Sequence, residues 1–161
     1  MDRRTALVRI AAAMVGGRLL SRSADAAESA AESEISWLGD LEAAHRLALE
    51  MNRPLLITFG AKWCTFCKKM DANTFADPAV VRAVNGSYVP VRLDFDAEPR
   101  VARVLEVRSI PCTIVLSPQA DLLARVDGYV DPQRYAAALA AADRLQSRVQ
   151  HARFERIRRA P

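Results

Sequence analysis

Two cysteines separated by two residues, Cys64 and Cys67, lie where a predicted strand gives way to a predicted helix. Residues 55–61 are mostly apolar and favour a strand, whereas residues 68–75 favour a helix. Cys64 would then lie at the helix N-terminus, where unpaired backbone N–H groups and the helix dipole stabilise a thiolate. We therefore expect the pKa of Cys64 to lie below the free-thiol value of about 8.5. Only a thiolate attacks a disulfide, and Cys67, one turn further on, is close enough to resolve the resulting mixed disulfide.

Other uses of a Cys-x-x-Cys pair need partners that this sequence does not supply. A structural zinc site needs four ligands, and beyond the pair the chain offers Cys112, His45 and His151, none in a second closely spaced couple. Covalent haem attachment needs a histidine directly after the second cysteine, where this chain has Lys68. A permanent structural disulfide stays open in an oxidising compartment, although the short spacing at a helix start favours a reversible one. We expect no metal and no cofactor beyond the dithiol.

A second informative residue is Pro111, at the entrance of an apolar, β-branched segment, residues 112–116. Proline cannot donate a hydrogen bond to a β ladder, so it belongs at the first residue or at the edge of a strand. An ordinary trans proline satisfies this pattern as well as a cis proline does, and a cis X-Pro bond costs little compared with other cis peptides.

Taken together, the cysteine pair and Pro111 resemble the thioredoxin superfamily. The resemblance covers residues 37–145 and is strongest to small periplasmic thioredoxin-like proteins and to the C-terminal domain of a membrane thiol reductase. It implies an α/β thioredoxin fold, with a central mixed sheet of four to five strands flanked by helices. The segments that carry the resemblance are residues 52–56, 63–70, 74–78, 89–94 and 127–129.

The resemblance also implies roles for the residues around the dithiol. In the family, the equivalent of Pro111 is cis and packs against the two cysteines. The preceding residue, here Ile110, offers backbone hydrogen bonds to an extended substrate. Trp63 would shape the substrate surface beside Cys64. Lys62, two residues before Cys64, adds positive charge that should favour the thiolate.

Two features depart from the family pattern. Many thioredoxins carry a buried aspartate six residues before the first cysteine, where this chain has Thr58, a neutral hydroxyl. The basic residue that partners this aspartate in the family aligns with Arg92, which is therefore expected to lack its acid. Cys112 follows Pro111, where the family often has threonine. It is either a small buried core residue or a third redox thiol.

Within the domain, the pattern predicts the order helix, strand, helix, strand, helix, strand, strand, helix. Asp40 can cap the first helix, and Asp77 with Pro78 opens a helical piece after the Cys-x-x-Cys helix. The last helix is expected over Gln133–Leu145. The two early strands are joined through helices and should be parallel, whereas the last two should form a hairpin.

The chain begins with a segment unlike the rest. Residues 1–26 combine a basic start, a short apolar run and the cleavage-site pattern Ala24-Asp25-Ala26, which predicts an export signal. Arg3-Arg4-Thr5-Ala6-Leu7 resembles a twin-arginine motif. An Arg-rich leader also fits a mitochondrial presequence, so a mitochondrial location is the alternative to a periplasmic or otherwise exported one. The remaining segments are a linker, the thioredoxin-like domain and a basic C-terminal tail, at residues 27–34, 35–145 and 146–161.

Charge is concentrated at the two ends of the chain. The formal net charge is +4, yet residues 27–143 hold 12 basic and 16 acidic residues. A nucleic-acid-binding domain would have a basic body, so nucleic acid is not an expected partner. The basic tail is either a solvated helix end or a weak contact with an anionic membrane surface. Protein thiols and disulfides, with an upstream thiol electron donor, are the expected partners of a monomeric protein.

Three classes of function fit these residues. The first is a thiol–disulfide oxidoreductase, a protein-disulfide reductase or electron relay that acts on extracytoplasmic proteins. The second is a disulfide oxidase or isomerase that uses the same residues at a different reduction potential. The third is a thioredoxin-fold binding module without turnover. The residues favour the first class, which the reduction potential separates from the second.

Overall fold

The structure of the protein is a computed structural model that describes residues 33–159. The predicted export signal and residues 27–32 of the predicted linker lie outside the described residues. In chain order the helices and strands are α2 (Leu41–Met51), β1 (Leu55–Gly60), α3 (Thr65–Asn73), α4 (Pro78–Ser87), β2 (Val89–Asp94), α5 (Pro99–Val104), β3 (Cys112–Leu116), β4 (Leu122–Asp127) and α6 (Pro132–Arg158).

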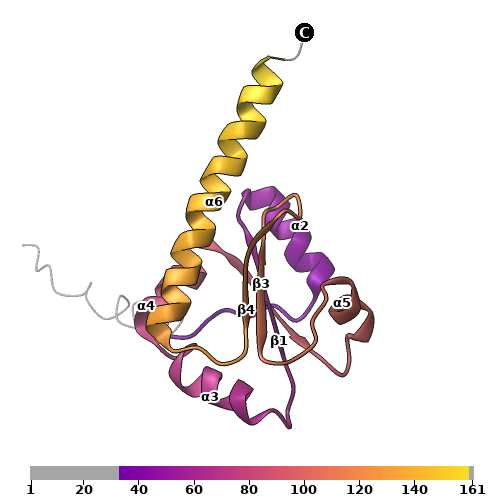
Figure 1. Ribbon diagram of the computed structural model, residues 1–161, viewed down its shortest axis with the longest axis vertical. Coiled ribbons are helices and arrows are strands. Elements are labelled where there is room, and N and C mark those ends of the chain that lie inside the picture. Colours follow the sequence, from indigo (N-terminus) through magenta and orange to yellow (C-terminus); the bar gives the residue numbers. More distant parts are fainter. Residues whose placement is uncertain (1–32, 160–161) are drawn as a thin grey trace, which may run out of the picture.

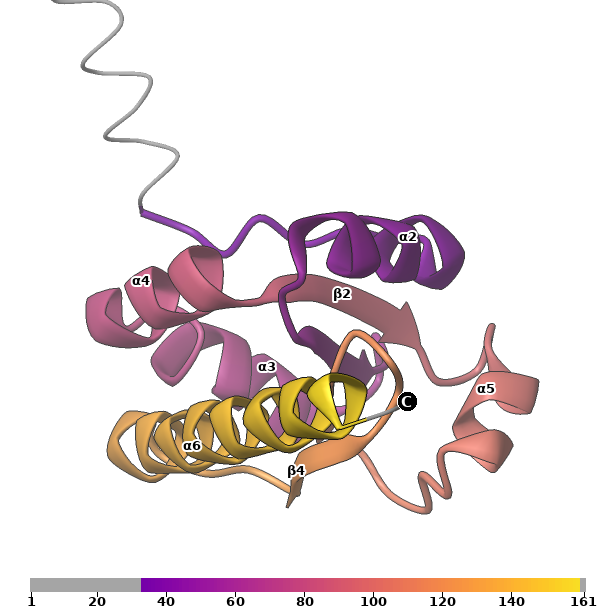
Figure 2. The ribbon, with the colours of Figure 1, turned by 90° about the horizontal axis from the view of Figure 1, so that it is seen from above.

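The four strands form one mixed sheet in the order β2-β1-β3-β4. β1 pairs in parallel with β2 and antiparallel with β3, and β3 pairs antiparallel with β4. The predicted mixed sheet, the parallel early strands and the final hairpin are therefore confirmed. Helices cover both faces, and Figure 2 shows α4 and α5 on opposite sides of the strands.

The side chains of β1 alternate between two apolar cores, because successive residues of a strand point to opposite faces. Leu55, Ile57 and Phe59 pack with α2 and α5. Leu56 packs on the other face with α3, α4 and α6. Since β1 is covered on both sides, its apolar residues form an almost continuous run, as expected of a central strand. The C-terminal end of this strand thus becomes a fixed platform for the loop that leads to α3.

Aspartates cap three of the helices that surround the sheet. The side chains of Asp40, Asp77 and Asp131 accept hydrogen bonds from backbone N–H groups in the first turns of α2, α4 and α6. Proline stands at the start of α4 and α6, where its missing N–H costs nothing. The predicted caps at Asp40 and Asp77 are confirmed.

The last helix is longer than its sequence pattern predicts. The predicted end at Leu145 is wrong, because α6 continues to Arg158. Gln146 is buried and continues the side of α6 that faces the domain. Further on, Arg153 forms an ion pair of 2.7 Å with Asp121. Between these two polar residues a single apolar residue, Val149, packs against the core, so the apolar period marks the continuation only weakly.

In Figure 1, α6 runs along the sheet and its C-terminal end projects beyond it. The N-terminus of α3 lies at the opposite end of the molecule. No helix within residues 33–159 is long and apolar enough to cross a membrane.

Candidate active site

The two cysteines of the Cys-x-x-Cys pair form a disulfide at the start of α3. The S–S distance is 2.06 Å and the two Cα atoms are 5.2 Å apart. Cys64 is the N-cap residue of α3, and its Sγ accepts a hydrogen bond of 3.1 Å from the backbone N–H of Cys67. The predicted place of Cys64 at a helix N-terminus is confirmed. Both side chains are nearly covered, with 5% of Cys64 and 8% of Cys67 exposed.

The end of β1 holds this turn in place. Gly60 is the last residue of the strand, and a Cβ at this position would stand 3.7 Å from both Cβ and Sγ of Cys67. The turn that follows closes with a hydrogen bond of 3.1 Å from the backbone N–H of Cys64 to the carbonyl of Ala61. The strand backbone therefore lies directly against the disulfide, and the buried sheet fixes the position of both sulfur atoms.

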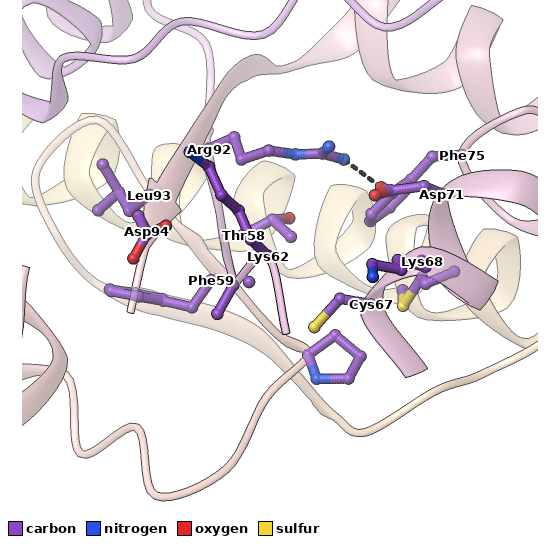
Figure 3. A pocket seen from close by; sticks show the side chains of 14 residues that line it. Thr58, Phe59, Lys62, Cys67, Lys68, Asp71, Phe75, Arg92, Leu93 and Asp94 are labelled. Carbon is purple, nitrogen blue, oxygen red and sulfur yellow. Dashed lines mark hydrogen bonds and ion pairs between the residues drawn. The ribbon is translucent and has the colours of Figure 1, made fainter. Parts of the chain in front are cut away.

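A pocket of about 350 Å³ lies behind Cys67 (Figure 3). Its walls come from the ends of β1 and β2 and from one side of α3. Pro111 also lines it, and the Ile110–Pro111 peptide bond is cis. Lys62 borders the pocket from the loop before Cys64. Ile110 is half-buried and packs against the core formed with α2 and α5.

Arg92 has an acidic partner in this pocket. The family's aspartate is absent at Thr58, as expected, but the Arg92 guanidinium forms an ion pair with another acid, the carboxylate of Asp71 on α3 (Figure 3). The same guanidinium lies 4.6 Å from the centre of the Trp37 ring and 5.5 Å from that of Phe75. Asp71 follows Cys67 by four residues, so both lie on one side of the helix. That spacing is a sequence signal that places Asp71 near Cys67, but it does not reveal the contact with Arg92.

Thr58 occupies the position of the family's buried acid and joins a chain of hydroxyl groups. Its Oγ1 lies 3.1 Å from Oγ1 of Thr113, which in turn accepts a hydrogen bond of 3.5 Å from the hydroxyl of Tyr135. Burial raises the pKa of Tyr135 to about 12. The acids of this pocket are therefore Asp71 on α3 and Asp94 at the end of β2, while β1 contributes only a neutral hydroxyl.

Two aromatic side chains are exposed beside the disulfide. Trp63 is 65% exposed and Phe66 is 61% exposed. The indole Nε1 of Trp63 donates a hydrogen bond of 2.7 Å to the carboxylate of Asp96. Asp94 accepts hydrogen bonds from the backbone N–H groups of Asp96 and Ala97 in the same loop. The loop after β2 thus holds the Trp63 ring in place, a contact that the sequence pattern does not reveal.

Cys112 belongs to the core on the other face of the sheet. It is fully buried and packs with Phe59 and Ile114 in the cluster formed with α2 and α5. Burial, and a hydrogen bond to Asp127, raise the pKa of the Cys112 thiol to about 12. These observations favour the interpretation of Cys112 as a small core residue.

Metal-binding side chains do not gather in the described part of the chain. Within residues 33–159 no group of three or more His, Cys, Asp or Glu side chains could hold an ion. His45 instead has its Nε2 at 3.0 Å from the carbonyl oxygen of Pro118.

A mixed four-stranded sheet flanked by helices, with a Cys-x-x-Cys disulfide at a helix N-terminus, is the arrangement of a thioredoxin-like protein. The family described as "Thioredoxin-like domain" matches residues 41–143, which is more than half of the chain. The chain belongs to this family.

Sequence relatives come from two groups of proteins. Over 144 residues the chain is 30% identical to "Thiol:disulfide interchange protein DsbD" of Cronobacter sakazakii, a match that covers 83% of this chain and 25% of the relative. It is 40% identical over 75 residues to "Thioredoxin C-3" of Corynebacterium nephridii, which covers 47% of this chain and 48% of that protein. The chain therefore spans about a quarter of the length of the interchange protein it matches.

Solved structures share the fold. A thioredoxin from Thermus thermophilus aligns with a TM-score of 0.61 at 22% identity, over 66% of this chain and 85% of that one. The C-terminal domain of DsbD from Neisseria meningitidis, in its oxidised form, aligns with a TM-score of 0.53 at 24% identity, over 62% of this chain and 93% of that one.

The burial of Cys112 leads to a test by alkylation. When the reduced, folded protein is treated with iodoacetamide at mildly alkaline pH, Cys112 should stay unmodified while Cys64 reacts. A buried thiol with a pKa of about 12 exposes almost no thiolate to the reagent. Peptide mapping by mass spectrometry would locate the label, and urea-unfolded protein, in which all three cysteines should react, is the control. Labelling of Cys112 as fast as Cys64 in the folded protein would contradict the structure.

Proposed function

We propose that this protein is a thiol–disulfide oxidoreductase that reduces, or relays electrons to, disulfides of extracytoplasmic proteins. The disulfide of Cys64 and Cys67 at the N-terminus of α3 is the observation that carries the proposal. The similarity to relatives named thiol:disulfide interchange proteins supports it. The predicted export signal at residues 1–26 supports a place of action outside the cytoplasm.

The first step requires the reduced form of the protein. An upstream dithiol produces it by thiol–disulfide exchange, in which the upstream dithiol is oxidised to a disulfide and the disulfide of this protein is reduced to two thiols. The Cys64 thiolate then attacks one sulfur of the substrate disulfide. The substrate S–S bond breaks, a new S–S bond joins Cys64 to the substrate, and the other substrate sulfur leaves as a thiolate that takes up a proton. The N–H of Cys67, which already points at Sγ of Cys64, stabilises the attacking anion.

The second step releases the substrate. The Cys67 thiol loses its proton and attacks Sγ of Cys64, which re-forms the intramolecular disulfide and expels the second substrate sulfur as a thiol. Two electrons have then passed from the dithiol to the substrate, and the two substrate sulfurs have taken up two protons. The two Cα atoms, 5.2 Å apart, already hold the sulfurs within bonding reach, so ring closure needs no movement of the backbone.

The surface around the disulfide suits an extended polypeptide substrate. Trp63 and Phe66 offer exposed apolar area on either side of Cys64, and exposed apolar patches commonly mark binding sites. We assign Ile110 and Pro111 to the positioning of the substrate backbone, since Pro111 lines the pocket beside Cys67. Lys62, at the same rim, adds positive charge toward the thiolate.

Insulin reduction tests the proposed activity. With dithiothreitol as electron donor, the wild-type protein should accelerate insulin precipitation, whereas Cys64→Ser should fall to the uncatalysed rate because it lacks the attacking thiolate. Cys67→Ser should still attack and accumulate a mixed disulfide visible on a non-reducing gel. Cys112→Ala is the matched control and should keep the wild-type rate.

Activity of Cys64→Ser equal to that of wild type would refute the dithiol mechanism, and an inactive wild-type protein would indicate a binding module.

Equilibration with glutathione buffers measures the reduction potential and so determines the direction of electron flow. A reductant should hold its disulfide at a potential below that of the glutathione pool, and a disulfide that glutathione reduces readily would mark an oxidase or isomerase instead.

Proton transfer in the second step gives a further prediction. We infer that Asp71, which lines the same pocket as Cys67, is the acid–base group that Thr58 does not provide. Asp71→Asn should slow the release of substrate from the mixed disulfide by about tenfold, since general acid–base groups contribute at least that much. Glu50→Gln, an exposed carboxylate on α2, is the control. Stopped-flow single-turnover traces would separate attack from release, and equal release rates in the two variants would contradict this role.

A further inference from the structure

The C-terminal end of α6 carries two large apolar side chains in solvent. Phe154 is 61% exposed and Ile157 is 75% exposed. Residues three apart are neighbours on a helix surface, so the ring of Phe154 and the branched side chain of Ile157 form one apolar patch. The ion pair between Arg153 and Asp121 is the described contact nearest to this end that joins α6 to the rest of the domain. Phe154 and Ile157 therefore extend past the body of the protein, where the domain cannot cover them.

The rest of this helix end is strongly basic. Residues 144–159 hold six arginines and one glutamate. At about 100° per residue, most of these arginines fall on the side of the helix opposite Phe154 and Ile157. Arg153 pairs with Asp121, and Arg158 and Arg159 share Glu155. Within residues 33–159 the structure shows no ion pair for Arg144, Arg148 and Arg156.

This combination fits one kind of partner. A helix that carries a basic side and a separate apolar patch of Phe and Ile lies in the interface of an anionic bilayer, with its arginines reaching to the headgroups. A nucleic acid would use the arginines and leave the apolar patch in water. The body of the domain, with 12 basic and 16 acidic residues over 27–143, would be repelled from a phosphate surface. Only the helix end is then attracted, and its polarity prevents it from spanning the bilayer.

We propose that the α6 end, residues 144–159, binds the surface of an anionic phospholipid bilayer, with Phe154 and Ile157 inserted among the lipids. Figure 1 shows this end at the opposite pole of the molecule from the N-terminus of α3. Attachment there leaves the disulfide of Cys64 and Cys67 facing away from the membrane. The protein is held at the bilayer while its dithiol stays open to partners.

Co-sedimentation with lipid vesicles tests this proposal. The full chain should sediment with vesicles of phosphatidylglycerol and phosphatidylcholine, much less with phosphatidylcholine alone, and less as salt is added. Arg148→Gln with Arg156→Gln should weaken binding by about thirtyfold, since each arginine near an anionic surface contributes about fivefold. Phe154→Ser with Ile157→Ser should weaken it by about the same factor. Insulin reduction without vesicles should stay at the wild-type rate in both.

Matched controls remove the same amount of charge, or two apolar side chains, from other parts of the surface. Arg82→Gln with Arg103→Gln removes two exposed arginines from α4 and α5, and Val104→Ser with Leu122→Ser removes two exposed apolar side chains. Both control proteins carry the same N-terminal residues and should bind as the wild type does.

Three results would overturn the proposal. The first is a wild-type chain that does not sediment with anionic vesicles, or variants that bind no worse than their controls. The second is a Phe154→Ser, Ile157→Ser protein that binds as well as wild type, which would mean a purely ionic contact such as a nucleic acid makes. The third is a wild-type dimer in analytical ultracentrifugation that these two substitutions dissociate, because the patch would then serve self-association.

Discussion

The hydrogen bond from the backbone N–H of Cys67 to Sγ of Cys64 is the contact on which the site depends. Three other helices of this domain begin with an aspartate whose carboxylate accepts the same kind of bond. At α3 a sulfur atom takes the place of that carboxylate. In the reduced protein Cys64 is therefore an N-cap residue whose thiolate form is stabilised, because the unpaired backbone N–H groups and the helix dipole favour negative charge there. In the proposed mechanism, the same local rule that starts helices elsewhere in the chain activates the nucleophile here.

Two different surfaces adjoin the disulfide: a pocket lined by charged side chains and an exposed aromatic surface. Several charged side chains line the pocket, among them the ion pair of Arg92 and Asp71, and the aromatic rings of Trp37 and Phe75 lie against the guanidinium. The central strand contributes only the hydroxyl of Thr58 at this point. On the outer surface, Trp63 is held by the loop after β2. The pocket is therefore suited to proton movement near Cys67, and the aromatic surface to contact with a substrate.

Sequence patterns predict most of the fold because its elements are marked locally. Aspartate caps, prolines at helix starts and the alternation of β2 lie within a few residues of the elements they define. The helix N-terminal position of Cys64 follows from the same signals. Contacts between distant segments carry no such mark, which is why the pair of Asp71 and Arg92 was missed. The continuation of α6 is only weakly marked in the sequence, because the polar residues Gln146 and Arg153 face the domain together with a single apolar residue, Val149. The side of the sheet that Cys112 faces could be assigned only once the strands were paired.

The ionisation of Cys64 in the reduced protein tests this account most directly. The rate of iodoacetamide alkylation of Cys64, followed against pH in Cys112→Ala protein, reports the fraction of thiolate. The urea-unfolded chain provides the reference midpoint for a Cys64 thiol that is not at the start of a helix. In the folded protein the rate should reach half its maximum clearly below the free-thiol value of about 8.5. A midpoint at or above that of the unfolded chain would show that the start of α3 does not stabilise the anion, and the proposed mechanism would lose its basis.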